Sequence, residues 1–182
     1  MNKNIEIEFK TAVSKEKYQE LIEVFQLENN IYKQVNYYFD TDHLDLSKKK
    51  VVLRIRQKRE HLFKVTLKSQ SDVGAFESHV FLNEDQAKDM IDKGFHAKDF
   101  FEDIDHFVTF KAKLENERAS TPYGLGTLFF DACTYNGITD YEIEYEVDEY
   151  DEGLKSFKQF IEKYNIEFTP AKRKSERALD TR

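Results

Sequence analysis

Cysteine is nearly absent from this chain of 182 residues. The single Cys133 excludes an internal disulfide and a cysteine-based metal site, so we expect a reducing, cytoplasmic location. Long apolar runs are also missing, because no segment approaches the roughly 18 apolar residues that a membrane span needs. The N-terminus also lacks the apolar region of a signal peptide. The sequence therefore predicts a cytosolic protein without a membrane partner.

Proline and glycine are scarce too, with two and six residues. No linker rich in Gly, Ser or Pro interrupts the chain, and its length fits one core, so we predict a single domain over residues 1–182. The formal net charge of −7 argues against a nucleic-acid or anionic-membrane binder, because such proteins depend on a net basic surface. The many tyrosine and phenylalanine residues permit a homodimer.

Hydrophobic periodicity predicts a chain rich in strands, with several amphipathic helices. Asn83 followed by Gln86 resembles a capping box, and 135–137 reads as a hairpin turn. The predicted strands cover 5–13, 32–40, 50–59, 62–69, 75–82, 106–118, 124–135 and 139–148. The predicted helices cover 15–28, a segment from Asn83 toward Lys93, 97–103 and 151–164.

Four of these strands place charges at alternate positions, so that each has one charged face and one apolar face. A single strand of this kind is typical of a wet antiparallel face over a core. Four strands with charges of mostly one sign favour another explanation, because opposed like charges destabilise a sheet unless a ligand offsets them. The charged faces are Glu6, Glu8 and Lys10; Arg54, Arg56 and Lys58; Lys64, Thr66 and Lys68; and Glu142, Glu144 and Glu146.

The apolar faces require cover, which the amphipathic helices can supply. We therefore expect a barrel with helices outside and charged side chains inside. Arg and Lys groups suit phosphate oxygens, and paired carboxylates suit hard cations such as Mg²⁺ or Mn²⁺. No Walker-type glycine loop is present, which excludes a P-loop enzyme.

The stretch Glu6-Ile7-Glu8-Phe9-Lys10 resembles the ExExK motif of the CYTH superfamily, the triphosphate tunnel metalloenzymes. The resemblance covers almost the whole chain in the family's order and is closest to the small stand-alone bacterial members. The further matching segments are Tyr37-Tyr38-Phe39-Asp40-Thr41, Leu53-Arg54-Ile55-Arg56, Thr66-Leu67-Lys68, Arg118, Phe130-Asp131, Tyr141-Glu142-Ile143-Glu144 and Lys174-Ser175-Glu176-Arg177.

This resemblance implies an α+β fold, mostly antiparallel β, with an eight-stranded closed barrel, a charged tunnel and helices packed outside. It also implies metal-dependent hydrolysis of a triphosphate: inorganic tripolyphosphate, thiamine triphosphate or a nucleoside triphosphate. By motif, the catalytic residues would be Glu6, Glu8, Lys10 and Glu144. The ligands of Mg²⁺ or Mn²⁺ would be Glu6, Glu8, Asp131, Glu142 and Glu144. The triphosphate would contact Arg54, Arg56, Lys64, Lys68, Arg118 and Lys174.

Several alternatives stay open at this point. The second acidic pair could be Glu144 and Glu146, and Lys172 competes with Lys174 for the basic position near the end of the chain. Glu77 could share the charged interior. The same phosphate site could serve a class IV adenylyl cyclase, or a module that binds polyphosphates or nucleotides without hydrolysis.

Overall fold

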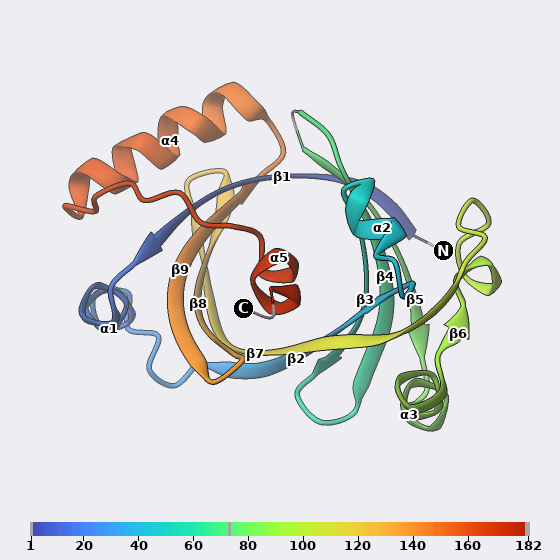
Figure 1. The fold of residues 1–182 in the computed structure, drawn as a ribbon. Helices are drawn as coiled ribbons and strands as arrows, with labels where there is room; N and C mark the ends of the chain where they lie inside the picture. The colour runs from blue at the N-terminus through green and yellow to red at the C-terminus, as the bar shows by residue number, and fades with distance from the viewer. Residues whose placement is uncertain (1, 73, 181–182) are drawn as a thin grey trace. The chain divides into compact units, whose positions relative to one another are not determined.

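The computed structural model describes residues 2–72 and 74–180, and its strands form one antiparallel sheet (Figure 1). The strand order is β2-β3-β4-β5-β1-β9-β8-β7-β6, and β2 also pairs with β7, which closes the sheet. Eight long strands and the two-residue β6 give the predicted closed antiparallel barrel of the α+β class, and this prediction is confirmed.

The strands are β1 (Asn2–Val13), β2 (Tyr32–Asp40), β3 (Val51–Lys58), β4 (Leu62–Gln70), β5 (Ala75–Leu82), β6 (Phe95–His96), β7 (Phe107–Tyr123), β8 (Gly126–Tyr135) and β9 (Ile138–Val147). The helices are α1 (Lys15–Val24), α2 (Asp45–Lys48), α3 (Glu84–Lys93), α4 (Tyr150–Lys163) and α5 (Lys174–Leu179), with a 3₁₀ turn η1 at Ala97–Asp99. Among the described residues, none of these helices is long and apolar enough to cross a membrane.

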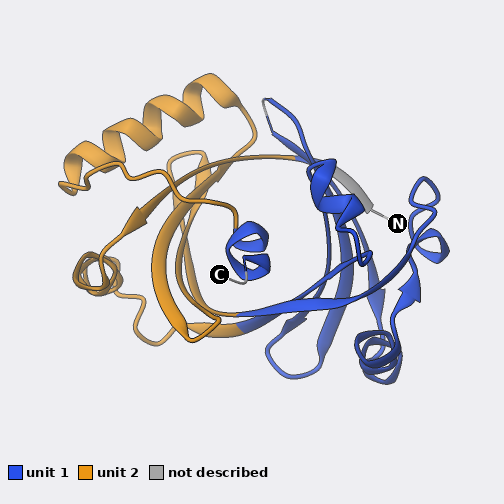
Figure 2. Cartoon of the chain, viewed as in Figure 1, with its two compact units in different colours: residues 1–5, 34–114, 174–182 blue, residues 6–33, 115–173 orange. Residues whose placement is uncertain are grey.

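The chain separates into two compact units (Figure 2). Unit 1 comprises residues 1–5, 34–114 and 174–182, and unit 2 comprises 6–33 and 115–173. Each unit has its own apolar core, so the two can be described separately. The predicted single domain over 1–182 stays a prediction.

Unit 1 packs α3 against the apolar face of β3, β4 and β5. Ile55, Phe63 and Val65 are almost completely buried and belong to one cluster with Ala87 and Met90 of α3. These strand residues alternate with charged ones, so the same period of two that buries the apolar side chains turns Arg54, Arg56, Lys64 and Lys68 to the opposite face.

Unit 2 uses the same arrangement with two helices. Leu21 of α1 and Phe160 of α4 are fully buried in a cluster with Phe130 of β8 and with Ile143 and Tyr145 of β9. Alternate residues of β8 and β9 therefore face away from these helices, and they include Asp131, Glu142, Glu144 and Glu146.

Local signals set several element boundaries. Ser14 Oγ accepts a hydrogen bond from Lys17 N and begins α1, while Asn83 Oδ1 accepts one from Gln86 N and begins α3 as predicted. The helix predicted to reach residue 28 ends at Val24, because Gln26 takes a left-handed φ of 56°. The predicted hairpin turn is confirmed by positive φ angles at Asn136 and Gly137.

The helix predicted over 97–103 is present only as η1, and two short helices were not predicted. In α2, Asp40 provides the missing cap: its carboxylate accepts hydrogen bonds from Leu46 N at 2.9 Å and from Ser47 N at 3.0 Å. In α5, which follows the basic segment near the end, Ala178 is buried. Both helices are too short to show an apolar period in the sequence.

Candidate metal centre and phosphate-binding face

Three carboxylates of unit 2 converge where β8 and β9 pair. Asp131 lies directly opposite Glu142, and Glu144 follows on the same face of β9. All three side chains are buried, and one oxygen of each lies within 4.8 Å of the others. Carboxylates this close repel one another when ionised, so this group, called here the inner acidic group, requires positive charge nearby.

Arg118 of β7 supplies part of that charge. Its Nε donates to Asp131 Oδ1 at 2.7 Å, and its Nη2 donates to Asp131 Oδ2 and to Glu144 Oε1, both at 2.8 Å. Burial disfavours the charged guanidinium, but attraction to Asp131 and then to Glu144 outweighs burial and raises the pKa of Arg118 well above its usual value. The guanidinium also lies 4.3 Å from the centre of the Phe129 ring.

A second acidic group lies beside the first. Glu6 and Glu8 of β1 and Glu146 of β9 each offer an oxygen within 4.8 Å of the others, and Glu8 lies directly opposite Glu146. This set, called here the outer acidic group, is only partly buried. Lys10 connects the two groups, since its Nζ lies 3.7 Å from Glu8 Oε1 and 3.9 Å from Glu144 Oε2.

The donor chemistry of both groups fits a hard divalent cation. All six donors are carboxylate oxygens, and adjacent ligand oxygens around Mg²⁺ lie about 3 Å apart, given bonds of about 2.1 Å. The oxygens of each group lie within 4.8 Å of one another, so they could hold such an ion. In the inner group, the ion would share Asp131 and Glu144 with Arg118.

Cys133 and Asn116 lie next to the inner acidic group. The Cys133 Sγ is 3.9 Å from both Asn116 Oδ1 and Glu142 Oε1, and all three residues are fully buried. The Asn116 Nδ2 atom has no hydrogen-bond partner within the described part of the chain. Glu142 therefore has polar neighbours outside the acidic group as well.

Basic side chains of unit 1 form a second candidate surface. Arg54 and Arg56 of β3 lie directly opposite Thr66 and Lys64 of β4, so all four side chains share one face. Lys68 lies on the same face, one pair further along and opposite Glu77 of β5. This face, called here the basic face, matches the sign pattern that the sequence predicts.

Two buried hydrogen-bond donors on the basic face could bind a ligand. The Nε of Arg54 and the Oγ1 of Thr66 are buried atoms without a hydrogen-bond partner among the described residues. They sit on directly opposed residues, whereas the Nε of Arg56 donates to Asn36 Oδ1 at 2.8 Å. A buried donor that lacks a partner costs free energy, and a phosphate oxygen between Arg54 and Thr66 would remove that cost.

The electrostatics of Lys64 also indicate an anion site. Burial first, and then the charges of Arg54 and Arg56, lower the pKa of its ammonium group below the usual value. Burial and the neighbouring positive charges therefore act in the same direction against the charged form of Lys64. A bound polyanion would relieve the repulsion between these positive charges.

The structure thus divides the predicted site residues between the units. Unit 2 brings together Glu6, Glu8, Lys10, Arg118, Asp131, Glu142 and Glu144. Unit 1 holds Arg54, Arg56, Lys64 and Lys68 on one face, and Lys174 is a buried residue at the start of α5. Their roles in metal and phosphate binding stay predictions.

Sequence reasoning left three candidates out of the predicted set. Glu142 and Glu144 lie together in the inner group, whereas Glu146 lies in the outer group, so the alternative pair of Glu144 and Glu146 is divided between the two groups. Thr66 and Asn116 carry the buried polar atoms described above. Alternation along the strands gives the correct face for each of them, but only the register shows which residues they meet.

The matching family model is the CYTH domain, which spans residues 4–179, and the chain belongs to this family. A curated relative from Bacillus subtilis, named "Putative triphosphatase YjbK", is 33% identical over 91% of this chain and 90% of its own length. A crystal structure from Bacillus halodurans, described as a "putative adenylate cyclase", is 32% identical, covers 97% of this chain and 98% of its own, and has a TM-score of 0.88.

A plant structure from Hippeastrum supports the fold alone. It is 22% identical, covers 94% of this chain and 93% of its own, and has a TM-score of 0.73. Its description names a "putative adenylyl cyclase" that reveals a dominant triphosphatase activity. The names of the similar proteins give two different activities, triphosphatase and adenylate cyclase.

Proposed function

We propose that the protein is a metal-dependent triphosphatase that acts on inorganic tripolyphosphate, thiamine triphosphate or a nucleoside triphosphate. The observation that carries this proposal is the inner acidic group, in which three buried carboxylates converge within 4.8 Å. Such crowding destabilises a fold unless positive charge offsets it, and a divalent cation would add to the charge that Arg118 supplies. The name of the curated Bacillus subtilis relative supports the same activity.

In this proposal, Mg²⁺ or Mn²⁺ would be held by Asp131, Glu142 and Glu144, together with Glu6, Glu8 and Glu146 of the outer group. The bound ion would neutralise phosphate charge and lower the pKa of a coordinated water. Lys10, which lies between both acidic groups, would orient Glu8 and Glu144.

Phosphate recognition would fall to cationic side chains. These side chains would be Arg54, Arg56, Lys64, Lys68, Arg118 and Lys174. Arginine and lysine offer several donors to phosphate oxygens, and the buried Nε of Arg54 with the hydroxyl of Thr66 adds two donors that are already in place.

The reaction itself would need little from the protein besides position and charge. Water attacks the terminal phosphorus in line with the leaving oxygen, the bond to the bridging oxygen breaks, and the shorter phosphate chain leaves with that electron pair. The cationic side chains stabilise the charge that develops on the phosphate oxygens. A carboxylate of the acidic groups accepts the proton from the attacking water.

A matched pair of glutamate variants tests this proposal. Glu8→Gln should reduce phosphate release in Mg²⁺ or Mn²⁺ by at least about 100-fold, since it removes a charged group at the reaction centre. Glu117→Gln alters an exposed glutamate on β7, so its rate should match the wild type. Circular dichroism should show that both variants are folded. Equal activity of Glu8→Gln and wild type would sink the metal assignment.

The Bacillus halodurans structure makes a cyclase the second candidate. Formation of cyclic AMP and diphosphate from ATP would decide for it, whereas release of orthophosphate decides for the triphosphatase. Tight binding of triphosphates without either product would show a non-hydrolysing module. The cytoplasmic location and the homodimer stay predictions, as does the absence of nucleic-acid and membrane partners.

A further inference from the structure

The aromatic ring of Phe81 lies on the charged side of β5. Phe81 is directly opposite Lys64 of β4, and directly opposed side chains of an antiparallel pair point to the same face. The ring is 58% exposed, although its strand neighbour Leu82 is buried among apolar side chains. A large apolar residue exposed on a basic face is not explained by the core or by phosphate binding.

His79 extends this apolar surface along the same strand. It lies directly opposite Thr66, and its ring meets that of Phe81 edge to face, with centroids 5.4 Å apart and an interplanar angle of 83°. Burial, and then the charge of Lys64, lower the pKa of His79, which favours the neutral form of its imidazole. The two rings therefore form one uncharged aromatic surface, called here the ring pair.

The ring pair lies next to the two buried donors, Thr66 Oγ1 and Arg54 Nε. Thr66 is opposite His79 on one side and opposite Arg54 on the other, so the three residues form one row across β5, β4 and β3. Adjacent strands are about 4.8 Å apart, which places the ring pair about one strand from Thr66 and two from Arg54. A group attached to a phosphate at this position would extend onto the rings.

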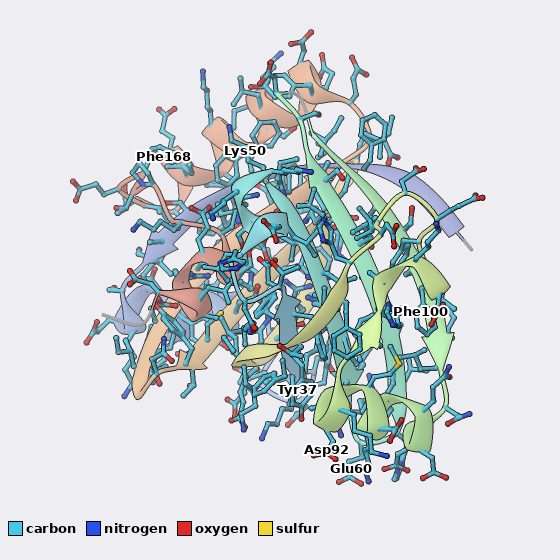
Figure 3. The ribbon with its side chains drawn as sticks, turned by 45° about the vertical axis from the view of Figure 1, so that its right-hand side comes forward. Tyr37, Lys50, Glu60, Asp92, Phe100 and Phe168 are labelled. Atoms are coloured by element: carbon cyan, nitrogen blue, oxygen red, sulfur yellow. The ribbon has the colours of Figure 1, made fainter. Side chains whose placement is uncertain are left out.

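The ring pair also lies toward one end of the basic face. Beyond Lys64 the chain reaches the turn between β3 and β4, and His61 Nδ1 of this turn is 3.7 Å from Glu84 Oε2 of α3. Figure 3 labels Glu60 of this turn and Asp92 of α3. Phe81 lies on β5 opposite Lys64, near this end of the basic face, and its ring is exposed. A group larger than a phosphate could therefore contact it.

We propose that His79 and Phe81 bind the aromatic heterocycle of an organic triphosphate, either a nucleobase or the heterocyclic part of thiamine. Stacking on an aromatic side chain is tolerant of the identity of the ring and is worth about a factor of 10 in affinity per ring. Inorganic tripolyphosphate has no group that could use this surface. The inference rests on the proposed function for its phosphate site and adds the class of substrate.

Binding in EDTA tests the inference without any need for turnover. Dissociation constants of the wild type are measured by calorimetry for ATP, thiamine triphosphate and inorganic tripolyphosphate. Phe81→Ala should weaken binding of ATP, thiamine triphosphate or both by about 10-fold and change tripolyphosphate binding less than twofold. Phe81→Tyr keeps a ring and should retain wild-type affinity for all three.

Phe76→Ala is the matched control, because Phe76 lies on the same strand, is also 58% exposed and points to the other face. It should change none of the constants. Equal weakening of all three ligands by Phe81→Ala, or no weakening of either organic ligand, would overturn the inference. If the wild type hydrolysed none of the three ligands in the presence of metal, the proposed function would be refuted. The ratios of the dissociation constants of Phe81→Ala and wild type would still decide whether the ring pair binds the heterocycle.

Discussion

Replacement of Asp131 by asparagine should destabilise the protein even when no metal is bound. Asp131 is completely buried, and its two oxygens accept hydrogen bonds of 2.7 and 2.8 Å from Arg118. Removal of one partner from a buried ion pair costs about 3–5 kcal/mol, because the other charge loses its compensation. Arg118 keeps its bond to Glu144 at 2.8 Å, and the substitution also relieves the repulsion between Asp131 and the two glutamates, so we expect a loss of at most the lower limit, about 3 kcal/mol.

Equilibrium unfolding in urea, followed by circular dichroism in EDTA at pH 7, measures this loss directly. Asp42→Asn is the control, because Asp42 forms an exposed ion pair with Lys111 at 2.7 Å, and such pairs contribute little. Its unfolding midpoint should equal that of the wild type. An unchanged midpoint for Asp131→Asn would refute the reasoning, since the buried pair would then contribute nothing to stability.

Three further substitutions test other parts of the structure. Lys64→Met should raise the urea midpoint at pH 7, because burial and neighbouring arginines lower the pKa of Lys64 in the folded state and make its charge costly there. The gain should fade as pH rises toward the unfolded pKa, and tripolyphosphate binding in calorimetry should weaken about 10- to 100-fold. Asp40→Ala removes the cap of α2 and should lower the unfolding free energy by about 3 kcal/mol in urea. Gly94→Ala should cost more than about 1 kcal/mol by thermal unfolding, because φ is +80° and the added Cβ would lie 2.5 Å from Val108 O.

Much of the fold follows from period-two alternation in the sequence. The strand predicted over 32–40 is found with the same limits, and the alternation in 139–148 gives the correct buried and charged faces of β9. β7 continues to Tyr123, beyond the predicted end at residue 118, because its pairing with β8 extends through Pro122 to Tyr123. Such pairing is a tertiary interaction that a local pattern does not contain.

Short helices were the main omission. α2 is held by the carboxylate of Asp40, four residues before its cap, and by no apolar stripe of its own. Its N-cap residue Leu44 has a left-handed φ of 57° and provides no side-chain hydrogen bond. A helix of this kind depends on contacts made by the rest of the fold, so its sequence resembles that of a loop.

For the site, the sequence indicates residue types and faces but not partners. Alternation places Glu142, Glu144 and Glu146 together on one face of β9. Only the pairing of β9 with β8 and β1 shows that the first two join Asp131, whereas Glu146 joins Glu6 and Glu8. The contact of Arg118 with Asp131 likewise depends on the β7–β8 register, in which the two lie opposite each other.

Phosphate release from the three triphosphates, followed against Mg²⁺ and Mn²⁺ concentration, tests the central proposal most directly. The account predicts that the wild type releases orthophosphate from at least one of them, with a rate that rises with metal and vanishes in EDTA. The carboxylates of the acidic groups are the only hard-cation ligand sets found in the described residues, so a metal requirement is essential to the proposal. No release from any of the three at any metal concentration, or release that persists in EDTA, would contradict it.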